Sequence, residues 1–293
     1  MFPFITTPRT TIFLSAFLFF AMSGFPHAHA DETVTPSDIH TPSEEAVVTR
    51  KHRMKKLEEH LSLDAEALPR RCRFESDIAE VPPEKRVVLT FDDGPEPGQT
   101  EYILSVLKKY NVPAAFFMIG EKVRAHPELV DLVRGSGNAL IGNHSWSHPN
   151  FHDIPAAEQA MEVGKTSALL TKAVEEKYFR YPYGNSSCET NELLKSLNYK
   201  IVGWHVDTCD WAFDHKGVVD EKEALSCGVL PQNRENFFDH VISSVRAHNG
   251  GIILMHEIHP NTLKQLDKLV AKLLADGYII GKLNNAEFSR YLR

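Results

Sequence analysis

The chain has 293 residues, of which 42% are hydrophobic and 24% are charged, and its formal net charge is −7. This acidic balance argues against a nucleic-acid-binding surface, which needs a concentration of Lys and Arg. The length is sufficient for one large α/β domain with a single core.

Residues 1–30 have the composition of a secretory signal peptide. Arg9 precedes an apolar stretch at 12–21 that is too short for a typical transmembrane helix, and Ala28-His29-Ala30 supplies a small-x-small cleavage signal. We therefore expect cleavage near Asp31 and export to the periplasm or the exterior of a bacterial cell, with no stable membrane span in the mature protein. The alternative is a retained N-terminal anchor.

Residues 31–80 are expected to form a linker and a helical segment. The stretch 31–45 is rich in Thr, Pro, Ser, Asp and Glu, a composition that cannot bury enough apolar surface to fold by itself. A helical pattern follows at 46–66. Its basic run at 50–56 is either one solvated helix face or a contact with an anionic cell wall or lipid. The main domain is predicted to be 81–293.

From Val87 onward, short apolar runs alternate with amphipathic helices, which is the pattern of parallel β/α units. Seven runs are predicted to be strands, at 87–91, 114–119, 139–142, 178–180, 200–206, 251–255 and 278–280. The main predicted helices between them are 102–110, 128–134, 156–173, 190–197, 237–247 and 262–275. We expect an α/β fold in which about seven parallel strands form one barrel-like domain.

Five polar clusters stand where predicted strands end, and a parallel barrel collects these ends on one rim. The first strand ends at Asp92 and Asp93, the third at His144, and the sixth at His256. Two imidazoles, those of His144 and His148, with one carboxylate form the ligand set of catalytic rather than structural zinc, which keeps an open coordination position. Taken alone, the histidines could be surface residues and Asp92 an N-cap or Asx-turn residue.

The five clusters, in chain order, resemble the motifs of the polysaccharide deacetylases of carbohydrate esterase family 4, the NodB-homology group. They are Thr90-Phe91-Asp92-Asp93-Gly94-Pro95, His144-Ser145-Trp146-Ser147-His148, Arg180-Tyr181-Pro182-Tyr183-Gly184, Asp207-Thr208-Cys209-Asp210-Trp211 and Leu254-Met255-His256. The resemblance covers the region from Val87 to Leu283. It implies a distorted barrel with fewer than eight β/α units, in agreement with the runs identified from periodicity.

The resemblance implies that Asp93, His144 and His148 bind a divalent metal. Zinc is the expected ion, and cobalt, nickel or iron would suit the same nitrogen and oxygen ligands. Asp92 would be the general base that takes a proton from the attacking water. Arg180 would hold Asp92 through a bidentate fork that favours its ionised form.

The remaining motif residues would serve the leaving group and the acetyl group. His256 would be the general acid that protonates the departing amine, and Asp207 would orient its imidazole and favour its charged form. The backbone N–H of Tyr183 would meet the oxyanion, while Trp211 and Leu254 would line a small acetyl pocket. Other residues near the motifs are expected to be non-catalytic: Asp210, which would hold its loop, and His152, His205 and His259.

Four cysteines are present, Cys72, Cys188, Cys209 and Cys227, and export permits disulfides between them. Three pairings are possible. Cys209–Cys227 is favoured because these residues bracket a polar segment, and four free buried thiols are the alternative. The segment 213–234 is expected to be an irregular loop that is stapled to the rim and shapes a binding groove.

Together these features predict an exported, metal-dependent deacetylase that hydrolyses the N-acetyl group of N-acetylglucosamine-type residues to free amine and acetate. Peptidoglycan is the expected polysaccharide because of the predicted export, not because of any residue, and chitin-like oligomers are further candidates. An O-acetyl esterase acting on xylan-like glycans and a glycan-binding pseudoenzyme are the alternatives.

Overall fold

The computed structural model describes residues 74–76, 78–170 and 176–293. The predicted signal peptide, nearly all of the predicted linker and helical segment, and Cys72 lie outside the described residues. Among the helices that are described, none is long and apolar enough to cross a membrane.

Within the described residues, eight strands form one sheet. They are β1 Arg86–Gly94, β2 Ala114–Met118, β3 Ala139–Asn143, β4 Lys177–Phe179, β5 Tyr199–Ile201, β6 Val206–Asp207, β7 Gly250–His256 and β8 Ile279–Ile280. The order is β5-β4-β3-β2-β1-β7-β6, with β8 paired to the start of β1, and all pairings are parallel. The predicted distorted barrel of parallel strands is confirmed.

The predicted fifth strand, 200–206, is in fact two strands, which is why eight are present instead of seven. Only residues 202–205 separate β5 from β6, yet the two stand at opposite ends of the strand order. The two edges must therefore approach each other, and the sheet curls toward a barrel. Gly203 lies at the break, where a Cβ atom would meet the Ser76 carbonyl oxygen at 2.2 Å, so the preceding chain segment passes too close for any side chain.

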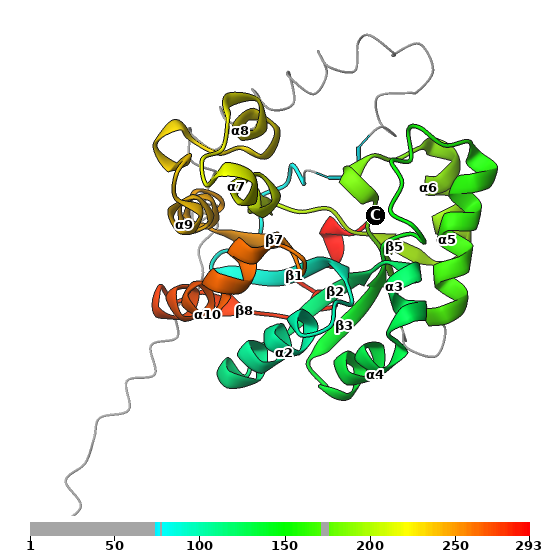
Figure 1. Ribbon diagram of the computed structural model, residues 1–293, viewed down its shortest axis with the longest axis horizontal. Coiled ribbons are helices and arrows are strands. Elements are labelled where there is room, and N and C mark those ends of the chain that lie inside the picture. The colour runs from blue at the N-terminus through cyan, green and yellow to red at the C-terminus, as the bar shows by residue number, and fades with distance from the viewer. Residues whose placement is uncertain (1–73, 77, 171–175) are drawn as a thin grey trace, which may run out of the picture. The chain divides into compact units, whose positions relative to one another are not determined.

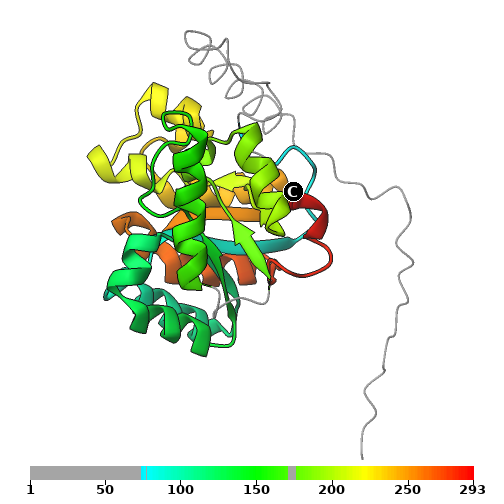
Figure 2. The same ribbon diagram turned by 90° about the vertical axis from the view of Figure 1, so that its right-hand side faces the viewer.

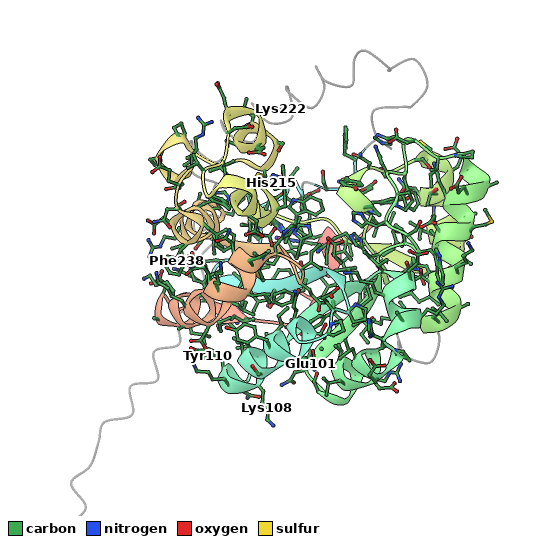
Figure 3. All side chains as sticks on the ribbon, in the orientation of Figure 1. Glu101, Lys108, Tyr110, His215, Lys222 and Phe238 are labelled. Carbon is green, nitrogen blue, oxygen red and sulfur yellow. A yellow bond between two sulfur atoms is a disulfide. The ribbon has the colours of Figure 1, made fainter. Side chains whose placement is uncertain are left out.

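Helices flank the strands (Figure 1). They are α2 Gln99–Tyr110, α3 Gly120–Ala125, α4 Pro127–Gly135, α5 Ala156–Leu170, α6 Cys188–Ser196, α7 Asp210–Lys216, α8 Glu221–Cys227, α9 Phe237–His248 and α10 Pro260–Ala275. Short 3-10 helices occur at Pro182–Gly184, Pro231–Asn233 and Ser289–Tyr291. Helix α2 is typical: it buries Ile103 and Val106 and directs Glu101 and Lys108 outward (Figure 3). In the view turned by 90°, α5, in green, runs in front of the strands (Figure 2).

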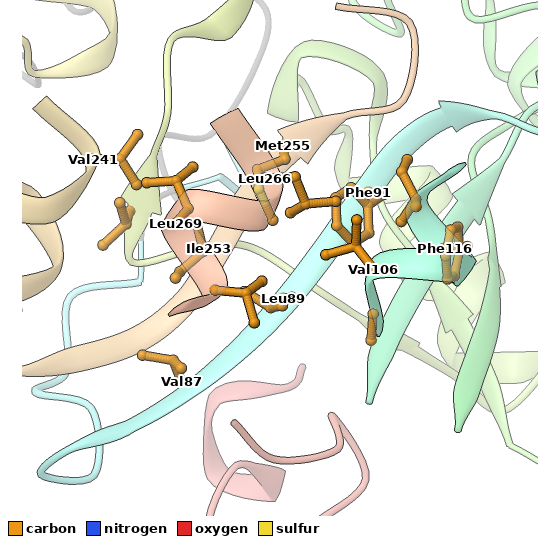
Figure 4. Close-up of a cluster of buried hydrophobic side chains, with 14 of the residues drawn as sticks. Val87, Leu89, Phe91, Val106, Phe116, Val241, Ile253, Met255, Leu266 and Leu269 are labelled. Atoms are coloured by element: carbon orange, nitrogen blue, oxygen red, sulfur yellow. The ribbon is translucent and has the colours of Figure 1, made fainter. Parts of the chain in front are cut away.

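Alternate residues of β1 face two hydrophobic cores, because successive strand side chains point to opposite sides. Val87, Leu89 and Phe91 belong to the core that also contains Leu266 of α10 (Figure 4). Val88 belongs to a second core on the other side, with Phe117, Tyr178, Trp204, Ile252, Phe288 and Tyr291. Each fully buried side chain of this size contributes about 1.5–3 kcal/mol. Burial on both sides makes β1 a rigid support for the carboxylates at its end.

The segment 213–234 was predicted to be an irregular loop, and that prediction was wrong. It contains most of α7, all of α8 and one 3-10 helix, with His215 on α7 and Lys222 on α8 (Figure 3). Asp220 and Glu223 form a capping box at the start of α8, a signal that is visible in the sequence. The predicted Cys209–Cys227 disulfide is confirmed, with the Cα atoms 5.6 Å apart.

Candidate active site

Two carboxylates stand at the end of β1. Asp93 has a φ of +71°, and the pairing of β1 with β2 shifts register between Asp92 and Gly94. This irregularity overrides the usual alternation of strand side chains and aims both carboxylates at one place. Asp92 Oδ2 lies 3.6 Å and Asp93 Oδ1 3.5 Å from Nε2 of His144. The chain thus begins to turn at Asp93, before Gly94.

The two histidines of the second motif follow β3 in a loop rather than a helical turn. Ser145 has a φ of +67° and His148 one of +59°, and His148 Nε2 lies 3.3 Å from Asp93 Oδ1. Nδ1 of His144 is 2.8 Å from the Arg180 carbonyl oxygen, which can only accept, so Nδ1 carries the proton. Nε2 of His144 is therefore the unprotonated nitrogen that faces Asp93, as a metal ligand requires.

The ligand atoms of Asp93, His144 and His148 all lie within 4.8 Å of one another. Asp93 Oδ1 is buried and accepts no hydrogen bond from the described residues, so a cation would satisfy it. Burial lowers the pKa of both imidazoles to about 4, which makes them neutral ligands at pH 7. These residues fit a divalent metal bound by two nitrogens and one oxygen.

Arg180 contacts Asp92, but not through the predicted bidentate fork. Its Nη1 donates to Asp92 Oδ1 at 2.8 Å and to Thr90 Oγ1 at 2.8 Å, while Nε and Nη2 donate to the carbonyl oxygens of Val202 and Gly203. The fork is divided because the fully buried guanidinium must satisfy all its donors within the protein. Burial raises the pKa of Asp92 to about 6 and outweighs the opposing effect of Arg180.

Asp210, rather than the predicted Asp207, is hydrogen-bonded to the imidazole of His256. His256 Nδ1 donates to Asp210 Oδ1 at 2.7 Å, and the His256 backbone N–H and the Thr262 hydroxyl donate to Oδ2 at 2.8 and 2.6 Å. Burial lowers the pKa of His256, but the Asp210 carboxylate outweighs it and raises the pKa to about 10. Asp210, which we expected only to hold its loop, therefore keeps this imidazole charged.

Asp207 instead supports the turn after β6. Its Oδ1 accepts the N–H of Cys209 at 2.9 Å, and its backbone oxygen accepts Nε2–H of His240 at 2.9 Å. Cys209 has a φ of +55°, and this turn directs Asp210, the first residue of α7, toward the end of β7. The assignment of the orienting contact to Asp207 is therefore corrected.

The other predicted site residues differ in exposure. Tyr183 is 64% exposed, and its ring centroid lies 4.8 Å from that of His148. Tyr183 has a φ of +57° inside the 3-10 helix that follows Arg180. Leu254 is buried in the second core, which also contains Val88, and Trp211 is half-buried against the core that contains Leu266.

A second cluster with metal-ligand atoms, Asp210, His256 and His259, lies beside the first. Both Asp210 oxygens already accept hydrogen bonds from His256, and Nδ1 of His259 lies 3.0 Å from Asp214 Oδ2. A metal at this place would have to displace these bonds, so the cluster is a hydrogen-bonded support for His256.

Glu257 is a buried carboxyl group that the sequence reading missed. The Thr100 hydroxyl donates to its Oε2 at 2.5 Å, and a Cβ atom on Gly94 would lie 1.7 Å from its Oε1. The Glu257 carboxyl thus occupies the space of a side chain at Gly94, and any larger residue there would have to displace it. Burial raises the pKa of Glu257 to about 8.

Glu257→Gln is expected to stabilise the metal-free protein at alkaline pH. The Glu257 pKa is 4.5 in its ordinary state and about 8 in the fold, so the wild type loses stability as pH rises from 4.5 to about 8. A neutral amide avoids this loss. In chelator, we expect a Tm about 2–8 °C above wild type at pH 8.5 and no such gain at pH 4.5. Equal gains at both pH values, or an equal gain for exposed Glu192→Gln, would contradict this explanation.

Several known proteins are similar to this chain in sequence and in fold. A family profile described as polysaccharide deacetylase matches residues 79–202. Peptidoglycan-N-acetylglucosamine deacetylase PgdA of Listeria monocytogenes is 33% identical over 210 residues, which cover 69% of this chain and 39% of that protein. A peptidoglycan-N-acetylglucosamine deacetylase of Bacillus cereus is 32% identical over 201 residues, which cover 67% of this chain and 84% of that protein. The chain thus spans 39% of the length of the first relative.

Solved structures show the same similarity. The Bc1960 peptidoglycan N-acetylglucosamine deacetylase has a TM-score of 0.57 and 30% identity, and the match covers 68% of this chain and 86% of that chain. BA3943 of Bacillus anthracis, described as a CE4 family pseudoenzyme, has a TM-score of 0.55 and 27% identity, and the match covers 68% of this chain and 64% of that chain.

Fold and site define a curled parallel-sheet protein with a candidate metal site, a buried carboxylate and a charged imidazole at the strand ends. The chain belongs to the polysaccharide deacetylases of carbohydrate esterase family 4. The family membership that the five motifs predicted is confirmed.

Proposed function

We propose that the protein is an exported, metal-dependent N-deacetylase that releases acetate from N-acetylglucosamine-type residues of peptidoglycan. One observation carries the proposal: Asp92 and His256 are direct Cα partners in the parallel pairing of β1 with β7. A carboxylate with a pKa of about 6 and an imidazolium with a pKa of about 10 thus stand side by side at the candidate metal site. This pairs a proton acceptor with a proton donor, as amide hydrolysis requires.

Asp93, His144 and His148 would hold the metal, with zinc the first choice and cobalt, nickel or iron as alternatives. When bound, the ion would polarise the acetyl carbonyl and acidify a water molecule. Asp92 takes the proton from the attacking water, and Arg180 holds its carboxylate in place through Nη1.

His256 gives a proton to the amine nitrogen as the C–N bond breaks, because an amide nitrogen leaves poorly unless it is protonated. Asp210 keeps the imidazole charged and fixes Nδ1, which leaves Nε2 to face the substrate. The backbone N–H of Tyr183 would stabilise the oxyanion, and Trp211 and Leu254 would border the acetyl group.

The export and substrate parts of the proposal have separate support. The composition of residues 1–30 favours a signal peptide, and the Cys209–Cys227 disulfide suits an oxidising compartment. The relatives described above are named for peptidoglycan N-acetylglucosamine, which would place this protein in the periplasm or at the cell wall. The domain assignment remains 1–30 signal peptide, 31–80 linker and helical segment, and 81–293 catalytic domain.

Acetate release tests the function directly. The purified protein, supplied with Zn²⁺, is incubated with peptidoglycan, chitin oligomers and acetylated xylan, with chelator-treated protein as the control. We expect acetate from the first or second substrate and none after chelation. Release only from xylan would indicate the O-acetyl esterase alternative. Metal-dependent glycan binding without release would indicate a pseudoenzyme, a role that the family contains.

Asp210→Asn is expected to move the alkaline limb of the pH–rate profile toward acid by about one to three pH units. His256 must be protonated to act, and without the Asp210 charge it loses its proton at a lower pH. The same pair stabilises the fold fully below pH 6.5, and this stability is lost as pH rises toward about 10. Asp131→Asn, at an exposed position, is the control and should leave the alkaline limb unchanged. If Asp210→Asn also leaves it unchanged, the assignment of His256 as the general acid is overturned.

A further inference from the structure

The loop that carries His144 and His148 holds an unfavourable backbone conformation. Ser145 and His148 both have positive φ, which L-residues other than glycine rarely adopt. Such a conformation persists only where surrounding groups hold it. His148 also has the more exposed ring, with a side chain 22% exposed against 2% for His144, so its position depends on the loop itself.

Glu162 of α5 supplies the strongest of these contacts. Its Oε2 accepts the backbone N–H groups of Trp146 and Ser147, both at 2.8 Å, and its Oε1 accepts the Ser147 hydroxyl at 2.9 Å. The Glu162 residue is only 6% exposed, so these bonds lie where water competes little. One carboxylate therefore holds the two residues that lie between Ser145 and His148.

Neighbouring groups complete the support on the carbonyl side. The Thr166 hydroxyl, also on α5, donates to the Ser145 carbonyl oxygen at 2.8 Å, as does the N–H of Gly120 at 2.9 Å. The N–H of Glu121 donates to the Trp146 carbonyl oxygen at 3.0 Å. These contacts fix the carbonyls, whereas Glu162 fixes the N–H groups next to His148.

We propose that Glu162 is a positioning residue that sets the metal affinity of the site by holding the His144–His148 loop. The inference rests on the proposed metal site. Outer partners of metal ligands typically change metal affinity by about 10–100-fold when they are removed. If Glu162 had a purely structural role, its removal would instead lower Tm without changing the Zn²⁺ affinity of the folded protein.

The test is the Zn²⁺ dissociation constant, measured by competition with a chromophoric chelator, together with the Tm of each metal-free variant. Glu162→Ala is expected to raise Kd about 10–100-fold. Glu162→Gln should stay close to wild type, because its oxygen can accept both N–H groups and its amide can donate to the Ser147 hydroxyl. Ser147→Ala removes one bond and should raise Kd about threefold to tenfold. Glu158→Ala, on the exposed face of α5, is the matched control.

A Kd for Glu162→Ala equal to that of Glu158→Ala would overturn the proposal, and so would an equal weakening in Glu162→Gln and Glu162→Ala. If Glu162→Ala does not fold, Ser147→Ala tests the proposal in its place, because an unchanged Kd in Ser147→Ala also overturns the proposal. Failure of the proposed metal site gives a different result, because the wild type itself would then bind no Zn²⁺. Failure of the proposed activity alone appears in the acetate assay and leaves the comparison of Kd values unchanged.

Discussion

Asp92→Asn is expected to lower turnover by about 10²–10⁴-fold while the protein still binds one equivalent of metal. An amide cannot take the proton from the attacking water, but it is close in shape to the carboxylate and can still accept from Arg180 Nη1, which lies 2.8 Å from Asp92 Oδ1. The metal ligands are Asp93, His144 and His148 in our proposal, so metal binding should be spared. The measurements are kcat on the accepted glycan and metal content of the same sample.

Asp131→Asn is the matched control, since Asp131 lies on α4 with a side chain that is 71% exposed. It should retain wild-type kcat. An Asp92→Asn protein with a near-normal rate would refute the assignment of Asp92 as the base. A variant that has lost its metal would show that Asp92, whose Oδ2 lies 3.6 Å from His144 Nε2, belongs to the metal site instead.

His148→Ala is expected to lose both metal and turnover. The substitution removes one of three proposed ligands, and the remaining pair, Asp93 and His144, offers only one nitrogen and one oxygen. Activity should fall to the level of the chelator-treated wild type. The readouts are metal content after dialysis and acetate release with and without added Zn²⁺.

His126→Ala provides the comparison, because His126 lies at the start of α4 and contacts Glu128 rather than the site. It should keep wild-type metal content. Full metal content in His148→Ala would remove His148 from the ligand set. Lost metal with retained turnover would be incompatible with a metal-dependent reaction. Of the two variants, only Asp92→Asn is expected to separate proton transfer from metal binding.

The sequence alone determined the fold class and the position of the five motifs at the ends of strands. Short continuous apolar runs and helices with buried stripes depend on local composition, so β1, β7 and α10 could be predicted from the chain. The five motifs were expected on one rim because parallel strands end there. The structure brings Asp92, Asp93 and the two histidines of the second motif together, as expected.

Only the tertiary structure decided which polar group faces which. Asp93 and Cys209 adopt positive φ although neither is glycine. The residue types therefore did not predict the turns that orient the carboxylates of Asp93 and Asp210. Glu162 and Glu257 lie outside the predicted site residues, and each contacts the site across a long sequence separation. Local sequence patterns report which face of an element is buried. The partners of a buried carboxylate depend instead on the packing of distant elements, which requires the folded chain.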